Sequence, residues 1–165
     1  MKCLTLIRHA KAAPATSSDQ DWDRPLEKSG ERDAAEMGHR LKNLQNKPGL
    51  VLASPAIRAA RTAQIICAAL KIPPAAIRKE ERLYLASPTE FRKVIQELGG
   101  DAHHLMIFGH NPGISEFADQ LASQRRIDNM PTCGIVTATF AIKSWAELEL
   151  GTAKEIEFDY PANVT

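Results

Sequence analysis

The 165-residue sequence predicts an α/β protein: a three-layer α/β/α sandwich with a mainly parallel sheet, formed by a single domain over residues 1–165. Three short apolar segments, at 3–7, 50–53 and 105–108, have the length and composition of buried strands. Amphipathic helical patterns separate them, and this alternation is typical of a parallel sheet with helices on both faces. Right-handed connections then place the carboxyl ends of the strands at one edge of the sheet, where ligands of such folds usually bind.

The segment after the first strand is polar and then helical. Arg8 and His9 end the strand directly, and residues 12–23 form a polar loop over the sheet edge. Periodic apolar residues predict a helix over 28–45, which the Asn-Lys-Pro-Gly sequence after it terminates. The apolar positions of this helix are Ala34, Met37, Gly38, Leu41 and Leu44.

The second strand, 50–53, leads into a helix whose start has two sequence signals. Ser54 is the predicted N-cap and Pro55 the first helical residue. Arg58 then lies just past the first turn, close to the end of the strand, and Arg61 and Thr62 can share its face. The apolar stripe of the helix consists of Ala56, Ala59, Ala60, Ala63, Ile66, Cys67 and Leu70.

The remaining elements continue the pattern. Residues 77–85 predict a short strand, and a capping box at 87–90 opens a helix that Gly99-Gly100 ends. The third buried strand is followed directly by Gly109-His110 and then by another amphipathic helix. Alternating apolar residues at 136–142 and 156–160 predict two neighbouring strands at the margin of the sheet.

Composition excludes several classes of function. With 21 basic and 20 acidic residues, the net charge of +1 gives no case for bulk binding of nucleic acid or of a membrane surface. No apolar run approaches the roughly 20 residues of a membrane span, and the first residues do not resemble an export signal. Cys3, Cys67 and Cys133 lack the spacing of metal ligands, which indicates reduced, mostly buried thiols and predicts a cytoplasmic protein.

Two arginines and two histidines follow the predicted strands at the same edge of the sheet: Arg8 and His9, then Arg58, then His110. Two guanidinium groups suit a tetrahedral dianion such as phosphate, because each offers a planar fork of donors. The N-terminus of the helix after Ser54 would add backbone N–H groups. A neutral histidine beside a bound phosphate can attack phosphorus in line and carry the phosphoryl group, while the other side chains stabilise the developing charge.

Each of these residues also has a simpler interpretation. Arg8-His9 could be a surface pair, Arg58 and Arg61 could belong to a solvated helix face, and His110 before Asn-Pro-Gly could cap a turn. Their convergence on one edge favours a phosphate pocket, because clustered cations are costly without an anion.

Four motifs resemble those of a known family. Leu6-Ile7-Arg8-His9-Ala10-Lys11 is similar to the Arg-His-Gly signature of the histidine phosphatase, or phosphoglycerate mutase-like, superfamily. The Arg-His-Ala-Lys variant, Asp23-Arg24-Pro25-Leu26 with Gly30, Ser54-Pro55-Ala56-Ile57-Arg58-Ala59 and Gly109-His110-Asn111-Pro112 resemble the short phosphohistidine phosphatases of the SixA type. The four motifs span nearly the whole chain in the family's order.

This resemblance implies a mechanism and assigns roles to the four residues. It implies that His9 is the catalytic nucleophile, that His110 assists it, and that Arg8 and Arg58 bind the phosphate. It also implies that His9 becomes phosphohistidine during turnover, that water then hydrolyses this intermediate, and that no metal or organic cofactor takes part.

One departure from the family pattern bears on the substrate. Ala10 replaces the commoner Gly, which is a modest change. Leu85, however, occupies the position where many members carry a Glu that protonates the leaving oxygen. Losing a general acid costs about 10²–10⁴ in rate on sugar phosphates, whereas a phosphorylated imidazole is a much better leaving group. The resemblance therefore implies a phosphorylated protein, such as one with a histidine-containing phosphocarrier domain, as the substrate.

Alternatives to this hypothesis depend on the acidic loop. Asp19, Asp21 and Asp23 are the other candidate acids; Asp19 and Asp21 are interpreted as solvated loop residues, and Asp23 as serving the turn at Arg24-Pro25. If one of them protonates the leaving group, the chain could be a phosphatase of small phosphate esters. A phosphate-binding module without turnover is the third possibility, in which His9 is a ligand contact only.

Overall fold

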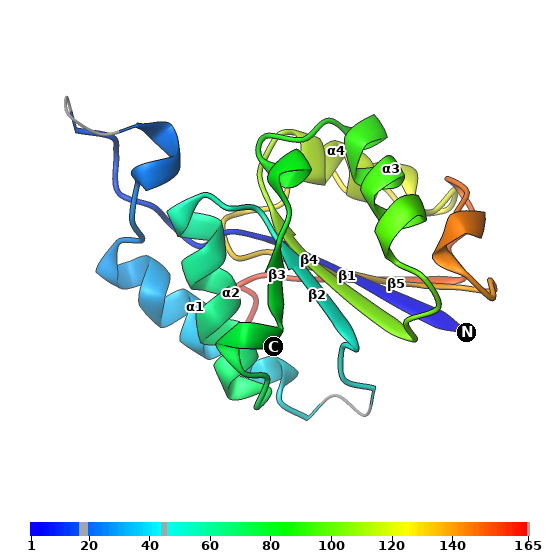
Figure 1. Ribbon diagram of the computed structural model, residues 1–165, viewed down its shortest axis with the longest axis horizontal. Coiled ribbons are helices and arrows are strands. Elements are labelled where there is room, and N and C mark those ends of the chain that lie inside the picture. Colours follow the sequence, from blue (N-terminus) through cyan, green and yellow to red (C-terminus); the bar gives the residue numbers. More distant parts are fainter. Residues whose placement is uncertain (17–19, 44–45, 165) are drawn as a thin grey trace.

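The computed structural model describes residues 1–16, 20–43 and 46–164. Within these ranges six strands form one sheet in the order β3-β2-β4-β1-β5-β6 (Figure 1). Their bounds are Lys2–Arg8 for β1, Leu50–Ala53 for β2, Ile77–Lys79 for β3, His104–Gly109 for β4, Ile135–Phe140 for β5 and Glu155–Asp159 for β6.

Most of the sheet is parallel, as the sequence predicts. Strands β3, β2, β4 and β1 pair in parallel, while β5 runs antiparallel to both β1 and β6. The two alternating segments near the C-terminus are therefore neighbouring strands, which confirms that prediction, and β6 forms the margin. The carboxyl ends of β1, β2 and β4 meet at one edge, since these strands are adjacent and run in the same direction.

Helices cover both faces of the sheet (Figure 1). Helices α1, Lys28–Leu41, and α2, Ile57–Ala69, pack against each other on one face, and α3, Pro88–Leu98, and α4, Gly113–Gln120, cover the other. Successive side chains of a strand point to opposite faces. Leu4 and Leu6 of β1 accordingly pack with α3 and α4, whereas Ile7 packs with α1 and α2. The predicted three-layer α/β/α sandwich is thus confirmed.

Two predicted boundaries are wrong. Helix α1 ends at Leu41 rather than at 45, and Leu44 and Gln45 lie outside the described residues. The segment 77–85 is a strand over its first three residues alone, because a 3₁₀ turn at Glu81–Leu83 follows, with the Glu80 carboxylate accepting the N–H of Arg82. That polar cap competes with extension of the strand.

The predicted start and end of α3 are both observed. The Ser87 hydroxyl accepts the N–H of Glu90 at 3.2 Å, with Pro88 as the first helical residue. At the other end, Gly100 has a φ of +58°, a conformation that favours glycine and turns the chain away from the helix axis.

The cysteines and the helices agree with the compositional predictions. The three cysteines are free thiols; Cys67 and Cys133 are buried, and burial raises the pKa of each of these two thiols to about 12. Such thiols are poor nucleophiles at neutral pH. No helix in the described part of the chain has both the length and the apolar character needed to cross a membrane.

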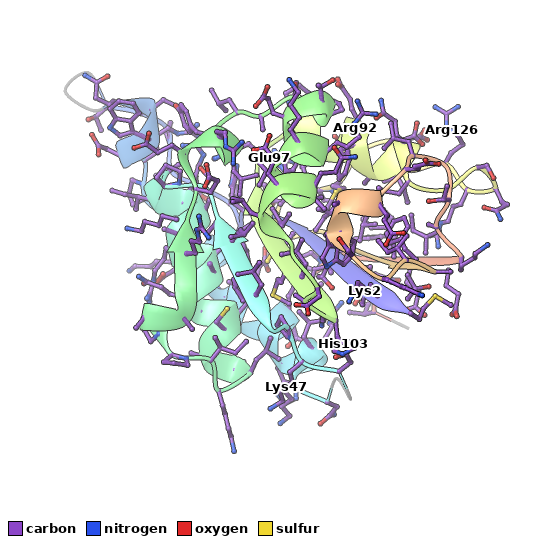
Figure 2. The ribbon with its side chains drawn as sticks, turned by 45° about the vertical axis from the view of Figure 1, so that its right-hand side comes forward. Lys2, Lys47, Arg92, Glu97, His103 and Arg126 are labelled. Carbon is purple, nitrogen blue, oxygen red and sulfur yellow. The ribbon has the colours of Figure 1, made fainter. Side chains whose placement is uncertain are left out.

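The amino ends of the strands form the edge opposite the convergence of β1, β2 and β4. Lys2, Lys47 and His103 lie there (Figure 2), and the Lys2 ammonium donates to the carbonyl of Asp101 at 2.6 Å. These basic residues are separated from Arg8 by the length of the sheet, so they take no part in the site described next.

Candidate active site

The end of β1 is held firmly on both sides. The N–H of His9 donates to the carbonyl of Gly109, at the end of β4, over 3.1 Å. The N–H of Cys133 donates to the carbonyls of both Arg8 and His9 at 3.0 Å, and the carbonyl of Gly134 accepts the N–H of Arg8. These contacts fix the position of the His9 ring at the carboxyl edge of the sheet.

Two further contacts hold the segment that follows His9. The Thr62 hydroxyl accepts the N–H of Ala10 at 3.0 Å and donates to the carbonyl of Arg58, which ties this segment to α2. Gly30 of α1 packs against the backbone of Lys11, where a Cβ at position 30 would lie 2.2 Å from the Lys11 carbonyl oxygen. Only glycine permits this approach, which explains its place beside the Arg-His-Ala-Lys motif.

The His9 ring is buried, with 8% of its surface exposed, and one of its nitrogens is engaged. Nδ1 lies 2.8 Å from the carbonyl oxygen of Ala10, which can only accept, so Nδ1 carries the proton. Burial, followed by the charges of Arg58 and Arg8, lowers the pKa of His9 to about 4 despite that hydrogen bond. The ring is therefore neutral at pH 7, and Nε2 holds a free electron pair.

His110 lies close to His9, with the ring centroids 5.2 Å apart. Its Nε2 is 2.7 Å from the Ser54 hydroxyl, and that hydroxyl already accepts the N–H of Ala56. The Ser54 hydroxyl can donate its own proton to Nε2, and in that tautomer the ring proton is on Nδ1. Burial, followed by the charges of His9 and Arg58, lowers the pKa of His110 to about 3.

The two arginines are anchored through their terminal nitrogens. Arg8 Nη1 donates to the carbonyl of Met130 at 2.9 Å. Arg58, 3% exposed, donates from Nη1 to the carbonyl of Asp21 at 2.8 Å and from Nη2 to the Asp21 carboxylate at 3.0 Å.

Three buried nitrogens of the site are left without a partner among the described residues: Arg8 Nε, Arg58 Nε and His110 Nδ1. Buried donors are nearly always hydrogen-bonded in native proteins, so three such groups around one imidazole indicate a site for an acceptor. Their charge and geometry suit an oxyanion. The structure thus brings together the four residues that the sequence predicts, His9, His110, Arg8 and Arg58; their chemical roles stay predictions.

Ser54 differs from its predicted role. Helix α2 begins at Ile57 with Ala56 in the N-cap position, and no side chain caps it. The Ser54 hydroxyl instead bridges the Ala56 N–H and the His110 ring, so it orients a histidine rather than starting the helix. The sequence signal for a cap is genuine, but a buried imidazole competes for the same oxygen.

Tyr84 is a site residue that sequence reasoning missed, and Asp21, predicted only as an alternative acid or a solvated loop residue, is a hydrogen-bond acceptor at the site. The Tyr84 hydroxyl donates to Asp21 Oδ2, and the Tyr84 ring lies edge-on against His110 with centroids 5.5 Å apart. Arg24 Nη1 reaches Asp21 Oδ1 at 3.2 Å. Asp21 is exposed, as predicted, but it also pairs with Arg58, Arg24 and Tyr84, which the sequence does not predict. A tyrosine directly before the position of the missing acid was the available signal.

The other two loop aspartates do not join this cluster. The structure records no hydrogen bond or ion pair for the Asp23 side chain, and Arg24 pairs with Asp21 instead, which corrects the predicted role of Asp23 in the turn. Asp19 lies outside the described residues.

In the part of the chain that the structure describes, no protonated acid takes the place of the missing glutamate. Leu85 is 55% exposed and has a φ of +51°. The hydroxyl of Tyr84, followed by Arg58 and Arg24, lowers the pKa of Asp21 to about 2, so this carboxylate holds no proton at neutral pH. Arg82, in the same motif, pairs with Glu80 and with Glu97 of α3, labelled in Figure 2, rather than with the phosphate site.

Among the described residues no group of three or more His, Cys, Asp or Glu side chains is placed to hold a metal ion. The polar groups of the site are donors and an imidazole electron pair, a set that fits an anion.

Comparison with known proteins identifies the family. Residues 4–84 match the model of the histidine phosphatase superfamily, branch 1; this range includes Arg8, His9 and Arg58 and stops before His110. An uncharacterized protein of Mycobacterium tuberculosis is 33% identical over 164 residues, which cover 94% of this chain and 99% of that protein.

Solved structures extend the match to the whole chain. A protein described as phosphohistidine phosphatase SixA from Nakamurella multipartitia superposes with a TM-score of 0.83 at 25% identity, covering 98% of this chain and 97% of that one. The protein histidine phosphatase SixA complexed with tungstate has the same fold, with a TM-score of 0.79 at 20% identity over 96% and 97% of the two chains. The chain belongs to the histidine phosphatase superfamily, and it is a SixA-type member.

Proposed function

We propose that this chain hydrolyses phosphohistidine on a protein, with His9 as the nucleophile. Membership of the superfamily supports a phosphatase. The observation that carries the finer proposal is the set of groups near His9: its neutral imidazole has a free Nε2 and lies 5.2 Å, centroid to centroid, from the His110 ring, and three buried donors of the same site have no protein partner in the described structure. A phosphoryl group placed among those donors would lie within reach of the nucleophile.

The first step is transfer of the phosphoryl group to His9. The electron pair of Nε2 attacks phosphorus, while Nδ1 keeps its proton on the Ala10 carbonyl, so His9 enters and leaves the step in one orientation. Arg8 Nε, Arg58 Nε and His110 Nδ1–H would donate to the phosphoryl oxygens as charge develops on them. Water then attacks the phosphorus of the intermediate, and the Nε2 pair returns to the ring.

The choice of phosphohistidine as substrate is supported by the lack, among the described residues, of a carboxylic acid that could protonate an alkoxide. Leu85 carries no acid, and the Asp21 carboxyl, with its pKa near 2, is ionised at neutral pH. A phosphorylated imidazole leaves as a neutral ring and needs no such donor. The same reasoning disfavours the small-ester alternative, which requires an acid.

A comparison of three substrates tests the proposal. Phosphate release is measured from a phosphohistidine-bearing carrier protein, from p-nitrophenyl phosphate and from glycerol phosphate. We expect rapid release from the carrier and an acid-labile, base-stable phosphate on His9 by mass spectrometry. Rapid turnover of glycerol phosphate with no release from the carrier would identify a small-ester phosphatase instead. Binding of the carrier without turnover of any substrate would identify a binding module.

A further inference from the structure

The Asp21 carboxylate lies on the solvent side of the pocket. Its side chain is 45% exposed, whereas that of Arg58, which it binds, is 3% exposed. Tyr84 joins the same carboxylate to the His110 ring. We call Asp21 and Tyr84 the rim of the pocket. His9 is more deeply buried, at 8% exposed, and its backbone is fixed at the strand ends.

In-line transfer directs the leaving group past this rim. The attacking and leaving atoms lie on opposite sides of phosphorus, so a group displaced by the buried Nε2 of His9 departs toward solvent. A leaving imidazole therefore passes Asp21 and Tyr84, and the charge it meets there affects how readily it departs.

Asp21 has one acceptor position to spare. An ionised carboxylate offers about four lone-pair positions. Among the described residues, Oδ2 accepts from Arg58 Nη2 and from the Tyr84 hydroxyl, while Oδ1 accepts from Arg24 Nη1 alone. The remaining Oδ1 position belongs to an exposed side chain, so an N–H group of a bound substrate can reach it.

We propose that Asp21 is a specificity-determining residue that accepts a hydrogen bond from the distal ring N–H of the substrate's phosphohistidine and so favours imidazole leaving groups over anionic ones. This inference rests on the proposed function. The pairing would mirror that of the nucleophile, whose own distal Nδ1–H donates to the Ala10 carbonyl. The imidazole of His9 and the imidazole of the substrate would then each donate their distal N–H to an acceptor, the Ala10 carbonyl in one case and the Asp21 carboxylate in the other.

The step balances without a separate acid. The substrate ring carries the phosphoryl group on one nitrogen and a proton on the other, and it is therefore cationic. His9 Nε2 forms a bond to phosphorus, the bond between phosphorus and the substrate nitrogen breaks, and its electron pair returns to that nitrogen. The product is a neutral imidazole that keeps its distal N–H on Asp21. An alkoxide or phenolate leaving group would instead meet the negative carboxylate.

The test compares two small substrates, N-phosphoimidazole and p-nitrophenyl phosphate, with Asp21→Asn and with Asp23→Asn as the matched control. Both residues lie in the 3₁₀ turn Asp21–Asp23, but the Asp23 side chain makes no recorded hydrogen bond or ion pair. For Asp21→Asn we expect kcat/KM on N-phosphoimidazole to fall about tenfold, as for loss of one charge-assisted hydrogen bond. On p-nitrophenyl phosphate, whose leaving group has no N–H to donate, kcat/KM should fall by a clearly smaller factor or rise, and Asp23→Asn should change neither.

Two results would overturn the inference. An equal fall on both substrates would mean that Asp21 acts through Arg58, as a positioning residue for the phosphate, and no change on either would mean that it has no role in transfer. Failure of the proposed function gives a different result, because wild-type protein would then not turn over N-phosphoimidazole or the phosphorylated carrier at all.

Discussion

The buried part of the site, which we call the floor and which consists of Arg8, His9, Arg58 and His110, differs from the exposed rim in how its polar groups are hydrogen-bonded. On the floor, Arg8 Nε, Arg58 Nε and His110 Nδ1 are buried and unpartnered in the described structure. At the rim, Asp21 is exposed and pairs with Arg58, Arg24 and Tyr84. Buried donors without a protein partner favour any tetrahedral oxyanion, because each can then form a charge-assisted hydrogen bond to it. The paired rim cannot add much binding energy, so its effect is on which group departs.

This contrast predicts that changes at the floor abolish or strongly reduce turnover, whereas changes at the rim alter it modestly and selectively. The variants below compare the two regions, beginning with the nucleophile.

Replacing His9 should have the largest effect. His9→Asn removes Nε2, so turnover of phosphohistidine protein and of p-nitrophenyl phosphate should fall on the order of 10⁴ or more, as for loss of a covalent nucleophile. The three floor donors remain, so tungstate binding measured by calorimetry should persist. Retention of more than a tenth of the wild-type turnover would contradict the role of His9.

Arg58→Lys should reduce kcat/KM about 10²–10³-fold, since an ammonium cannot replace Nε while still reaching both acceptors on Asp21. Arg61→Lys is the matched control on the same helix, because Arg61 is exposed and pairs with Glu31. Similar losses in the two variants, measured by steady-state kinetics on one substrate, would show that the effect is not specific to the pocket.

Acidification should destabilise the floor. The pKa values of His9 and His110 are lowered to about 4 and about 3, from about 6.5 in the unfolded chain. Between the folded and unfolded pKa values, the unfolded state binds more protons than the folded state. The contribution of each ring to the free energy of unfolding is therefore largest above pH 6.5 and declines as the pH falls toward the folded pKa. At pH 5 the loss is roughly 2 kcal/mol for each ring.

Urea unfolding at pH 7.5 and pH 5 measures this loss. Burial also lowers the pKa of His104, which acts in the same direction. In His9→Asn only the contribution of His9 is removed, so the free energy of unfolding should decline between the two pH values by roughly 2 kcal/mol less than in wild type. Tungstate should reduce the decline, because an oxyanion stabilises the charged rings. Equal stability at the two pH values would contradict the neutral state of both histidines.

Tyr84→Phe should have the smallest effect. Burial, together with the bond to Asp21, raises the pKa of Tyr84, so its hydroxyl is protonated and acts as a donor to that carboxylate. Loss of one exposed hydrogen bond should change kcat/KM on phosphohistidine protein by less than about fivefold. A fall of a hundredfold or more on glycerol phosphate would instead show that Tyr84 supplies the proton for an alkoxide.

The pattern of the sequence determined most of the fold. Buried strands of four to seven residues, separated by amphipathic helices, admit few arrangements other than a parallel sheet between helical layers. It also determined which residues reach the carboxyl edge, because Arg8 ends β1, His9 and His110 directly follow strands, and Arg58 lies in the first turn of α2. These features depend on local order along the chain.

Tertiary structure alone decided the contacts of the hydroxyls and carboxylates. Ser54 has a local cap signal, yet its hydroxyl serves His110, 56 residues away. Asp21 looks like a solvated loop residue, yet Arg58 and Tyr84, 37 and 63 residues away, converge on it. Short polar side chains have several competing partners within reach, and the choice among them depends on which buried groups the folded chain brings near, which no local pattern encodes.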